Sequence, residues 1–131
     1  MQSIFFYAIL CLLARKEGNM HYMSVKQPYF KQLKDGKKTI ELRCFDEKRQ
    51  KIKMGDYIVF TNSENTKENF QAKVVNLYWE KNFNALCNKI QPYQAGFRNK
   101  NDLTQALEEF YSPNDQQKFG VVGIEIGLIQ K

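Results

Sequence analysis

Three charged residues, Lys38, Glu41 and Arg43, lie close together in the segment DGKKTIELR of a 131-residue chain. A carboxylate between two cations can bind a ligand: Arg43 can hold a phosphate or a base edge bidentately, Lys38 supplies a point charge, and Glu41 accepts from an exocyclic amino group. Glu41 can also act as a general base on water, with Arg43 stabilising an oxyanion. The ordinary alternative is a surface ion pair between Glu41 and Arg43, worth about 0–1 kcal/mol.

A short helix is expected immediately before this charged segment. The peptide PYFKQLKDG, residues 28–36, begins with Pro28, which suits the first turn of a helix. Gly36 suits the positive φ that ends many helices. The apolar residues of the peptide share one helical side: Tyr29, Phe30 and Leu33.

The segment TIELRCF, residues 39–45, is expected to be the strand that carries the charges. Side chains alternate along a strand, so Glu41 and Arg43 share one face with Thr39, and the other face is the core. The core face consists of Ile40, Leu42 and Cys44. Lys38 precedes the extended part of the strand, and we expect its side chain to turn toward Glu41.

The remaining elements predict a small mixed domain. We expect strands over residues 21–26, 57–60, 70–79 and 119–129, and helices over residues 83–90 and 101–112. Residues 46–56 form a charged connection ending in a Gly55-Asp56 turn, residues 62–69 a polar loop, and residues 91–100 an irregular segment. Because strands and helices do not alternate regularly, we expect one α+β domain over residues 20–131, built on a small mixed β-barrel with peripheral short helices.

The net charge of +6 is concentrated in one part of the chain. Between Lys31 and Lys53 the sequence has nine basic and four acidic residues, and this segment alone contributes +5. A local excess of this kind can attract a polyanion such as nucleic acid through counterion release. The ordinary alternative is a solvated basic face without a partner.

The cysteines and the histidine limit the available chemistry. Cys11, Cys44 and Cys87 are an odd number without CxxC spacing, so the sequence indicates neither a disulfide framework nor a zinc ribbon, and a reducing cytoplasm fits best. A single histidine, His21, excludes a two-histidine metal site. A hard cation on Glu41 or Asp56 remains compatible with the sequence. We expect no cofactor and no resident metal.

Residues 1–19 contain the apolar run SIFFYAILCLLA, which is shorter than the roughly 20 residues that a membrane span needs. It lacks the basic region and cleavage site of a signal peptide. One hypothesis is a translated leader of a bacterial gene with the native start at Met20, and another is an additional apolar helix or strand packed on the domain. Neither a membrane nor an obligate protein partner is expected.

The charged segment resembles the G-x-K-x-x-E-x-R signature of ASCH domains (activating signal cointegrator homology domains). Gly36 and Lys38 match its first half, and Glu41 and Arg43 its second. The preceding SVKQPYF is similar to the family's strand that ends in Ser-x-x-Gln-Pro-aromatic. Gly55-Asp56 and the closing GVVGIEI are similar to its later strands, so the resemblance extends from Met20 to the C-terminus.

The resemblance implies a PUA-like fold with a cleft lined by the signature lysine, glutamate and arginine, in which the family is thought to bind RNA. RNA or a nucleotide-like ligand is therefore the expected partner. The expected ligand-binding residues are Tyr29, Gly36, Lys37, Lys38, Thr39, Glu41, Arg43, Lys48, Arg49 and Lys51. The aromatic residues that could stack on bases are Tyr29, Phe45, Trp79 and Phe97.

Two other classes of function stay open. One ASCH branch resembles amidohydrolases of acetylated cytidine, in which a lysine activates a threonine nucleophile. Lys38 matches that lysine, but Glu41 occupies the position of the nucleophile. In an enzyme, Lys38 and Glu41 would be the catalytic residues, and ribonuclease activity is a second option. A domain that recognises a protein or regulates transcription is the third class.

Overall fold

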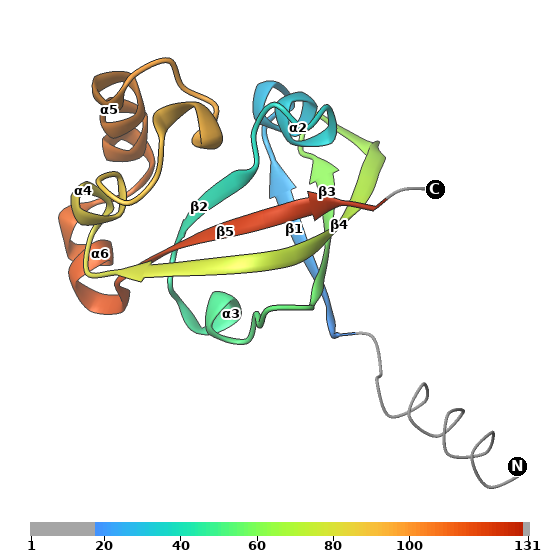
Figure 1. Ribbon diagram of the computed structural model, residues 1–131, viewed down its shortest axis with the longest axis horizontal. Coiled ribbons are helices and arrows are strands. Elements are labelled where there is room, and N and C mark those ends of the chain that lie inside the picture. The colour runs from blue at the N-terminus through green and yellow to red at the C-terminus, as the bar shows by residue number, and fades with distance from the viewer. Residues whose placement is uncertain (1–17, 130–131) are drawn as a thin grey trace, which may run out of the picture.

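The computed structural model describes residues 18–129, so the N-terminal extension expected over residues 1–19 lies almost wholly outside the described residues. The elements in chain order are β1 (Met20–Val25), α2 (Gln27–Lys34), β2 (Ile40–Cys44), α3 (Glu47–Gln50), β3 (Tyr57–Asn62), β4 (Asn65–Glu80), α4 (Phe83–Leu86), the 3-10 helix η1 (Pro92–Ala95), α5 (Lys100–Phe110), α6 (Pro113–Phe119) and β5 (Val121–Leu128) (Figure 1).

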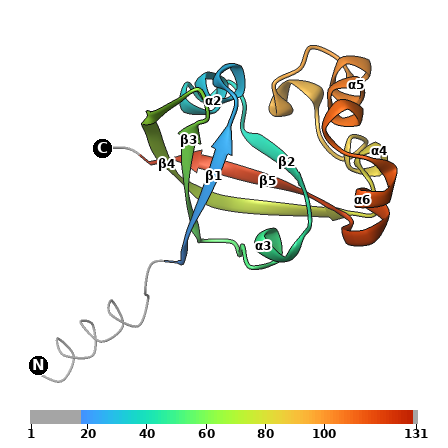
Figure 2. The same cartoon turned by 180° about the vertical axis from the view of Figure 1, so that it is seen from behind.

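The five strands form one sheet in the order β1-β3-β4-β5-β2. β1 pairs in parallel with β3, and the other neighbours are antiparallel. The sheet curls into a half-barrel, with α4, α5 and α6 gathered on one side and α2 at one end (Figures 1 and 2). This arrangement confirms the expected α+β class with a small mixed barrel and short helices.

The helix before the charged segment is confirmed as α2, which spans Gln27–Lys34. Pro28 lies in its first turn, and Phe30 and Leu33 are buried. Gly36 has a φ of 80°, as predicted for the residue that turns the chain from α2 toward β2.

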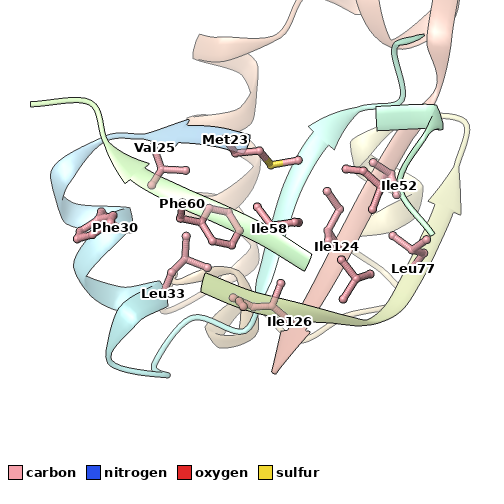
Figure 3. Close-up of a cluster of buried hydrophobic side chains, with 13 residues drawn as sticks. Met23, Val25, Phe30, Leu33, Ile52, Ile58, Phe60, Leu77, Ile124 and Ile126 are labelled. Atoms are coloured by element: carbon pink, nitrogen blue, oxygen red, sulfur yellow. The ribbon is translucent and has the colours of Figure 1, made fainter. Parts of the chain in front are cut away.

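The half-barrel encloses one of two hydrophobic cores (Figure 3). The side chains in this core come from α2, from all strands except β2 and from Ile52 between α3 and β3, and they include Phe30, Phe60, Ile58 and Ile124. The second core lies between the other face of the sheet and the helices α4 and α5. It contains Ile40, Leu42, Cys44, Leu86, Leu103 and Leu107.

β2 has a core on each side, which changes the environment of its charged residues. Ile40, Leu42 and Cys44 enter the second core, as the alternation predicted. Glu41 pairs with Ile124 and therefore points to the half-barrel side, where Ile124 is buried. The face that the sequence left open between a surface ion pair and a ligand site is thus turned inward, and Glu41 is only 6% exposed. The alternative of a surface ion pair is therefore wrong.

The prediction of a polar loop over residues 62–69 is wrong, because β4 begins at Asn65 and pairs with β3 in a hairpin. Only Ser63 and Glu64 connect the two strands. The buried Asn62 side chain accepts from the backbone N–H of Glu64 at 2.9 Å and shapes the turn. Residues 65–69 are exposed, so no apolar alternation marks this part of the strand.

The C-terminal half differs from the prediction in where its helices begin and end. α4 stops at Leu86 instead of residue 90, because 3-10-type bonds such as Lys89 N–H to Leu86 C=O replace the helical ones, while Ile90 still reaches the core. A further helix, α6, begins at Pro113, directly after the helix expected over residues 101–112. Ser112 caps α6 by accepting a hydrogen bond from the Asp115 N–H.

Three smaller differences follow the same local rules. The charged connection contains α3, because Asp46 accepts from Arg49 N–H at 3.1 Å and caps one helical turn. The segment expected to be irregular contains η1. The last strand begins at Val121, since Phe119 belongs to α6 and Gly120 turns the chain with a φ of 71°.

Among residues 18–129, no helix combines the length and the apolar character that crossing a membrane requires. Cys44 and Cys87 are buried free thiols, and burial raises the pKa of both.

Candidate functional site

Lys38, Glu41 and Arg43 form a row of cation, carboxylate and cation in which Lys38 and Glu41 are buried and Arg43 is partly buried. Lys38 Nζ lies 2.8 Å from Glu41 Oε1, and Arg43 Nη2 lies 2.8 Å from Glu41 Oε2. Arg43 Nε also donates to Glu41 Oε2 at 2.9 Å. Lys38 is 5% exposed, so the ammonium and the carboxylate are both removed from bulk water. We call these three residues the triad.

Local backbone contacts position Lys38. After Gly36, the Lys38 backbone N–H donates to the Gln32 carbonyl at 3.0 Å, which ties the residue to the last turns of α2. Gly96 has a φ of 91°, and a Cβ built there would lie 3.3 Å from Lys38 Cδ. The Lys38 side chain is therefore held against the end of η1 and aimed at Glu41.

Arg43 joins the two edges of the sheet. β1 and β2 are the outermost strands in the sheet order, so neither has a second strand neighbour in the described residues. Arg43 Nη2 donates to the backbone carbonyl of Ser24, in β1, at 2.9 Å. A side chain thus bridges the opening of the half-barrel where a strand pair would close a full barrel.

The triad carries a net positive charge. Burial by itself raises the pKa of Glu41, but the neighbouring Lys38 and Arg43 outweigh it and leave this pKa below its ordinary value. Burial also opposes the charge on Arg43, and the Glu41 carboxylate holds the pKa of Arg43 above its ordinary value. Glu41 is therefore ionised at neutral pH, and one cation in the row is not neutralised.

A cavity of about 240 Å³ lies over the triad. Its walls come from β1 and α2 on one side and from η1, Phe97 and α5 on the other. The lining is largely apolar above the charged floor, a combination typical of sites for small molecules. The principal wall residues are Val25, Tyr29, Phe97, Leu103, Phe110 and Tyr111.

Aromatic rings enclose the charged floor. Lys38 Nζ lies 4.7 Å from the centroid of the Tyr29 ring, and the Tyr29 and Phe97 rings are 6.0 Å apart and tilted by 44°. Burial, with a further contribution from Glu41, raises the pKa of Tyr29. Burial is also the main cause of the raised pKa of Tyr111. Both hydroxyls therefore stay protonated at neutral pH and can donate hydrogen bonds.

The structure separates the predicted site residues into two groups. Tyr29, Lys38, Glu41 and Arg43, with the aromatic candidate Phe97, line the cavity. Gly36 forms the turn before β2, and Thr39 bonds through its backbone to Gln94 and Ile126. The other basic candidates do not line the cavity: Lys37, Lys48, Arg49 and Lys51.

The remaining aromatic candidates also lie outside the cavity. Phe45 and Trp79 pack on each other edge to face, with ring centroids 6.3 Å apart. Arg49 forms an ion pair with Asp46 at 3.0 Å within the short helix α3. The basic residues of this part of the sequence therefore lie in two places: Lys38 and Arg43 line the cavity, and the others lie outside it.

Sequence reasoning did not find the residues that close the cavity. Lys26, Ser63, Phe110 and Tyr111 line it but were not predicted as site residues. In α5, the apolar residues Leu103 and Leu107 lie at helical spacing and pack in the second core. The one available signal was that this spacing continues to Phe110, beyond the part of the helix that the core covers.

No group of three or more histidine, cysteine, aspartate or glutamate side chains gathers as a metal site among residues 18–129. Glu41 already accepts from two cations, and Asp56 is bonded to His21 Nε2 at 2.7 Å and to the Lys53 N–H at 3.0 Å. The carboxylates that the sequence left open for a hard cation are thus engaged by protein groups.

The profile of the ASCH domain matches residues 23–130 of this chain. The chain belongs to the ASCH domain family. The match contains the second half of β1 and every element from α2 to β5, and with them the triad. No curated protein sequence matches the chain significantly.

Solved structures support the same ASCH fold. The hypothetical protein PH0355 is 30% identical, with a TM-score of 0.74, covering 84% of this chain and 99% of that chain. The protein PF0455 from Pyrococcus furiosus is 27% identical, with a TM-score of 0.67 and coverages of 86% and 99%. A mutant form of the ASCH protein from Zymomonas mobilis is 15% identical, with a TM-score of 0.62 and coverages of 85% and 69%.

The ASCH neighbours support a PUA-like fold for this chain, as the resemblance implied. ASCH domains are generally linked to RNA binding. Neither fold nor family specifies the ligand, so the function must be argued from the cavity and the triad.

Proposed function

We propose that this ASCH domain binds RNA or a nucleotide-like ligand in the cavity over the triad. The observation that carries the proposal is the ion-paired row of Lys38, Glu41 and Arg43, largely removed from water at the floor of an aromatic-walled cavity. Aromatic walls favour a planar base, and a positive floor favours electron-rich oxygens and nitrogens. A surface ion pair would need neither the burial nor the cavity.

The hydrogen bonds inside the triad limit what a ligand can contact. A carboxylate has about four positions at which it can accept a hydrogen bond. In Glu41, Lys38 occupies one position on Oε1, and Arg43 occupies two positions on Oε2. One position on Oε1 is left for an exocyclic amino group. Within residues 18–129, the hydrogen bonds of Arg43 use Nε and Nη2, so Nη1 is the nitrogen left for a ligand.

This geometry revises the role expected of Arg43. Its bidentate fork already holds Glu41, so it meets a ligand through Nη1 and not through two parallel bonds. Lys38 donates one hydrogen bond to Glu41 and keeps further N–H donors in the cavity. The triad therefore presents donors from two nitrogens beside one acceptor, a pattern that suits the polar edge of a base.

The exposed lysines would act outside the cavity. Lys37, Lys48 and Lys51 are exposed and do not line it. Phosphate contacts from such residues supply sequence-independent affinity that falls as salt rises, while the cavity supplies selectivity. We place this binding in the cytoplasm, because the buried thiols of Cys44 and Cys87 suit a reducing compartment.

A hydrolase acting on RNA or on a modified nucleoside is the alternative. It would need Glu41 as a general base, and a base works best when its pKa lies near the working pH. The pKa of Glu41 is lowered, and three of its acceptor positions are occupied. These observations favour binding over base catalysis.

The experiment incubates the purified full chain with short single-stranded RNAs, cytidine and acetylated cytidine over a series of salt concentrations. Fluorescence anisotropy or calorimetry measures binding, and chromatography of the same samples detects products. The proposal predicts saturable binding without product. RNA affinity no greater than that of an unrelated protein of equal charge would overturn it, and a time-dependent product would establish the hydrolase instead.

A further inference from the structure

Two residues at the rim of the cavity, Lys26 and Phe110, contact each other across it. Lys26 directly precedes α2, and Phe110 is the last residue of α5. Lys26 Nζ lies 4.9 Å from the centroid of the Phe110 ring, and both residues line the cavity. The contact therefore joins the barrel side of the cavity to the helical side.

Phe110 differs from the other aromatic residues of the cavity in its exposure. Tyr29, Phe97 and Tyr111 are partly buried, whereas Phe110 is 49% exposed. It follows Leu103 and Leu107 at the spacing of one helical stripe, and both of these leucines are buried. Phe110 thus continues the inward stripe of α5 beyond the core, and it lines the cavity while about half of it stays exposed to solvent.

We propose that Phe110 and Lys26 form an outer subsite for the nucleotide next to the one in the cavity. The Phe110 ring stacks on the second base, and the Lys26 ammonium leaves the ring for the phosphate that links the two nucleotides. The inference rests on the proposed function and narrows its ligand to single-stranded RNA of at least two nucleotides, in place of a free nucleoside.

The surface beyond Phe110 is compatible with a longer strand. Tyr111, the next residue, lines this cavity and also a second cavity of about 680 Å³ between α4, α5 and α6. Six polar or charged residues contribute to the lining of this second cavity: Lys81, Asn82, Asn84, Glu108, Gln116 and Gln117. Amide and lysine side chains can bond to base edges and phosphates, so a strand passing Phe110 finds further polar contacts.

The test compares ligands of two lengths on the same protein. The probes are the four nucleoside 5′-monophosphates and the single-stranded RNA tetranucleotides of the same bases, titrated by calorimetry at low salt. The quantity measured is the ratio of tetranucleotide to mononucleotide affinity. We expect a ratio of about tenfold or more, because stacking of one base is typically worth that much.

The variants are Phe110→Ala, Phe110→Trp and Lys26→Gln, with Tyr93→Ala as the matched control. Tyr93 is an aromatic residue that is 66% exposed and does not line the cavity. The ratio should fall toward one in Phe110→Ala and persist in Phe110→Trp and Tyr93→Ala. Lys26→Gln should reduce the slope of log affinity against log salt for the tetranucleotides by roughly 0.7.

The possible failures are distinguishable. Mononucleotide binding without any gain for tetranucleotides overturns the outer subsite and leaves the proposed function standing. The subsite is also overturned if the higher affinity for tetranucleotides survives in Phe110→Ala. It is overturned as well if Tyr93→Ala lowers that affinity as much as Phe110→Ala does. If the unmodified protein binds none of the probes, both proposals fail.

Discussion

At the residue scale, the distinctive feature is a glutamate that stays ionised although it is buried. Removing water from Glu41 is unfavourable, and Lys38 and Arg43 compensate through short ion pairs. The same pairs leave only one acceptor position and the remaining N–H groups of the cations for a ligand. The Glu41 carboxylate therefore has two roles: it orients Lys38 and Arg43, and it can accept one hydrogen bond from a ligand.

The pKa of Glu41 leads to a prediction about acid stability. Because this pKa is lower in the folded protein than in the unfolded chain, Glu41 contributes stability that is present above about pH 4.3 and is lost as the pH falls through the folded pKa. Glu41→Gln should be about 3–5 kcal/mol less stable at neutral pH, since it leaves the buried cation of Lys38 and the partly buried cation of Arg43 without their carboxylate.

The difference between Glu41→Gln and the unmodified protein should narrow on acidification. Urea unfolding at several pH values from neutral down to about pH 3 measures it, and the other carboxyl groups, present in both proteins, cancel in the comparison. A difference that stays constant over this range would show that the Glu41 ion pairs do not contribute in the way described.

At the scale of elements, two turns and one strand place the triad. Gly36 turns the chain out of α2, and β2 carries Glu41 and Arg43. Gly96, at the end of η1, has no side chain and so leaves room for the side chain of Lys38. The sequence predicted the first two, because a glycine after a helix and alternation in a strand are local patterns. It did not predict the third, since the contact of Gly96 with Lys38 is formed only in the fold.

Gly96→Ala tests this positioning, with Gly55→Ala as its control. Both glycines have a positive φ, 91° and 92°, so alanine should cost about 1–2 kcal/mol of backbone strain at each. A Cβ on Gly96 would also lie 2.5 Å from Gln32 Oε1 and 3.3 Å from Lys38 Cδ, whereas a Cβ on Gly55 meets nothing within 4 Å.

Urea unfolding should therefore show a loss of stability in both glycine variants, and RNA titration should show a loss of affinity only in Gly96→Ala. Equal affinities of the two variants for RNA would mean that the position of Lys38 is not important for binding.

At the scale of the whole molecule, the half-barrel is closed by a side chain. The sheet order leaves β1 and β2 at opposite edges, and Arg43 bonds to Ser24 between them. The order of the elements predicted a small mixed barrel, but not this closure. A contact between a strand edge and an arginine nineteen residues later has no local signature in the sequence.

The same limit explains why the sequence left the charged face of β2 open between a surface ion pair and a ligand site. Alternation correctly separated Glu41 and Arg43 from Ile40 and Leu42, but periodicity cannot reveal that both faces of a strand are covered. Phe110 and Tyr111 were not identified as wall residues for a related reason: the spacing along a helix does not show where the core ends.

Arg43→Lys tests the closure, because it keeps the charge but loses the planar group that reaches Glu41 and Ser24 together. Amide hydrogen exchange should accelerate in β1 while the β3–β4 hairpin stays protected. Arg49→Lys is the matched control, since Arg49 pairs with Asp46 outside the cavity. Unchanged protection of β1 in Arg43→Lys would contradict the bridging role.

The most direct test of the central claim compares Lys38→Met with Lys37→Met in RNA titrations at low and high salt. The substitutions remove the same charge from adjacent residues, one buried over Glu41 and one exposed. Lys38→Met should lower affinity by about tenfold or more at both salt concentrations, because a buried charged donor is lost. Lys37→Met should cause a smaller loss that disappears as salt screens the surface. If both variants are folded and lose the same amount of RNA affinity at low salt, and if both losses disappear at high salt, the result would contradict the account.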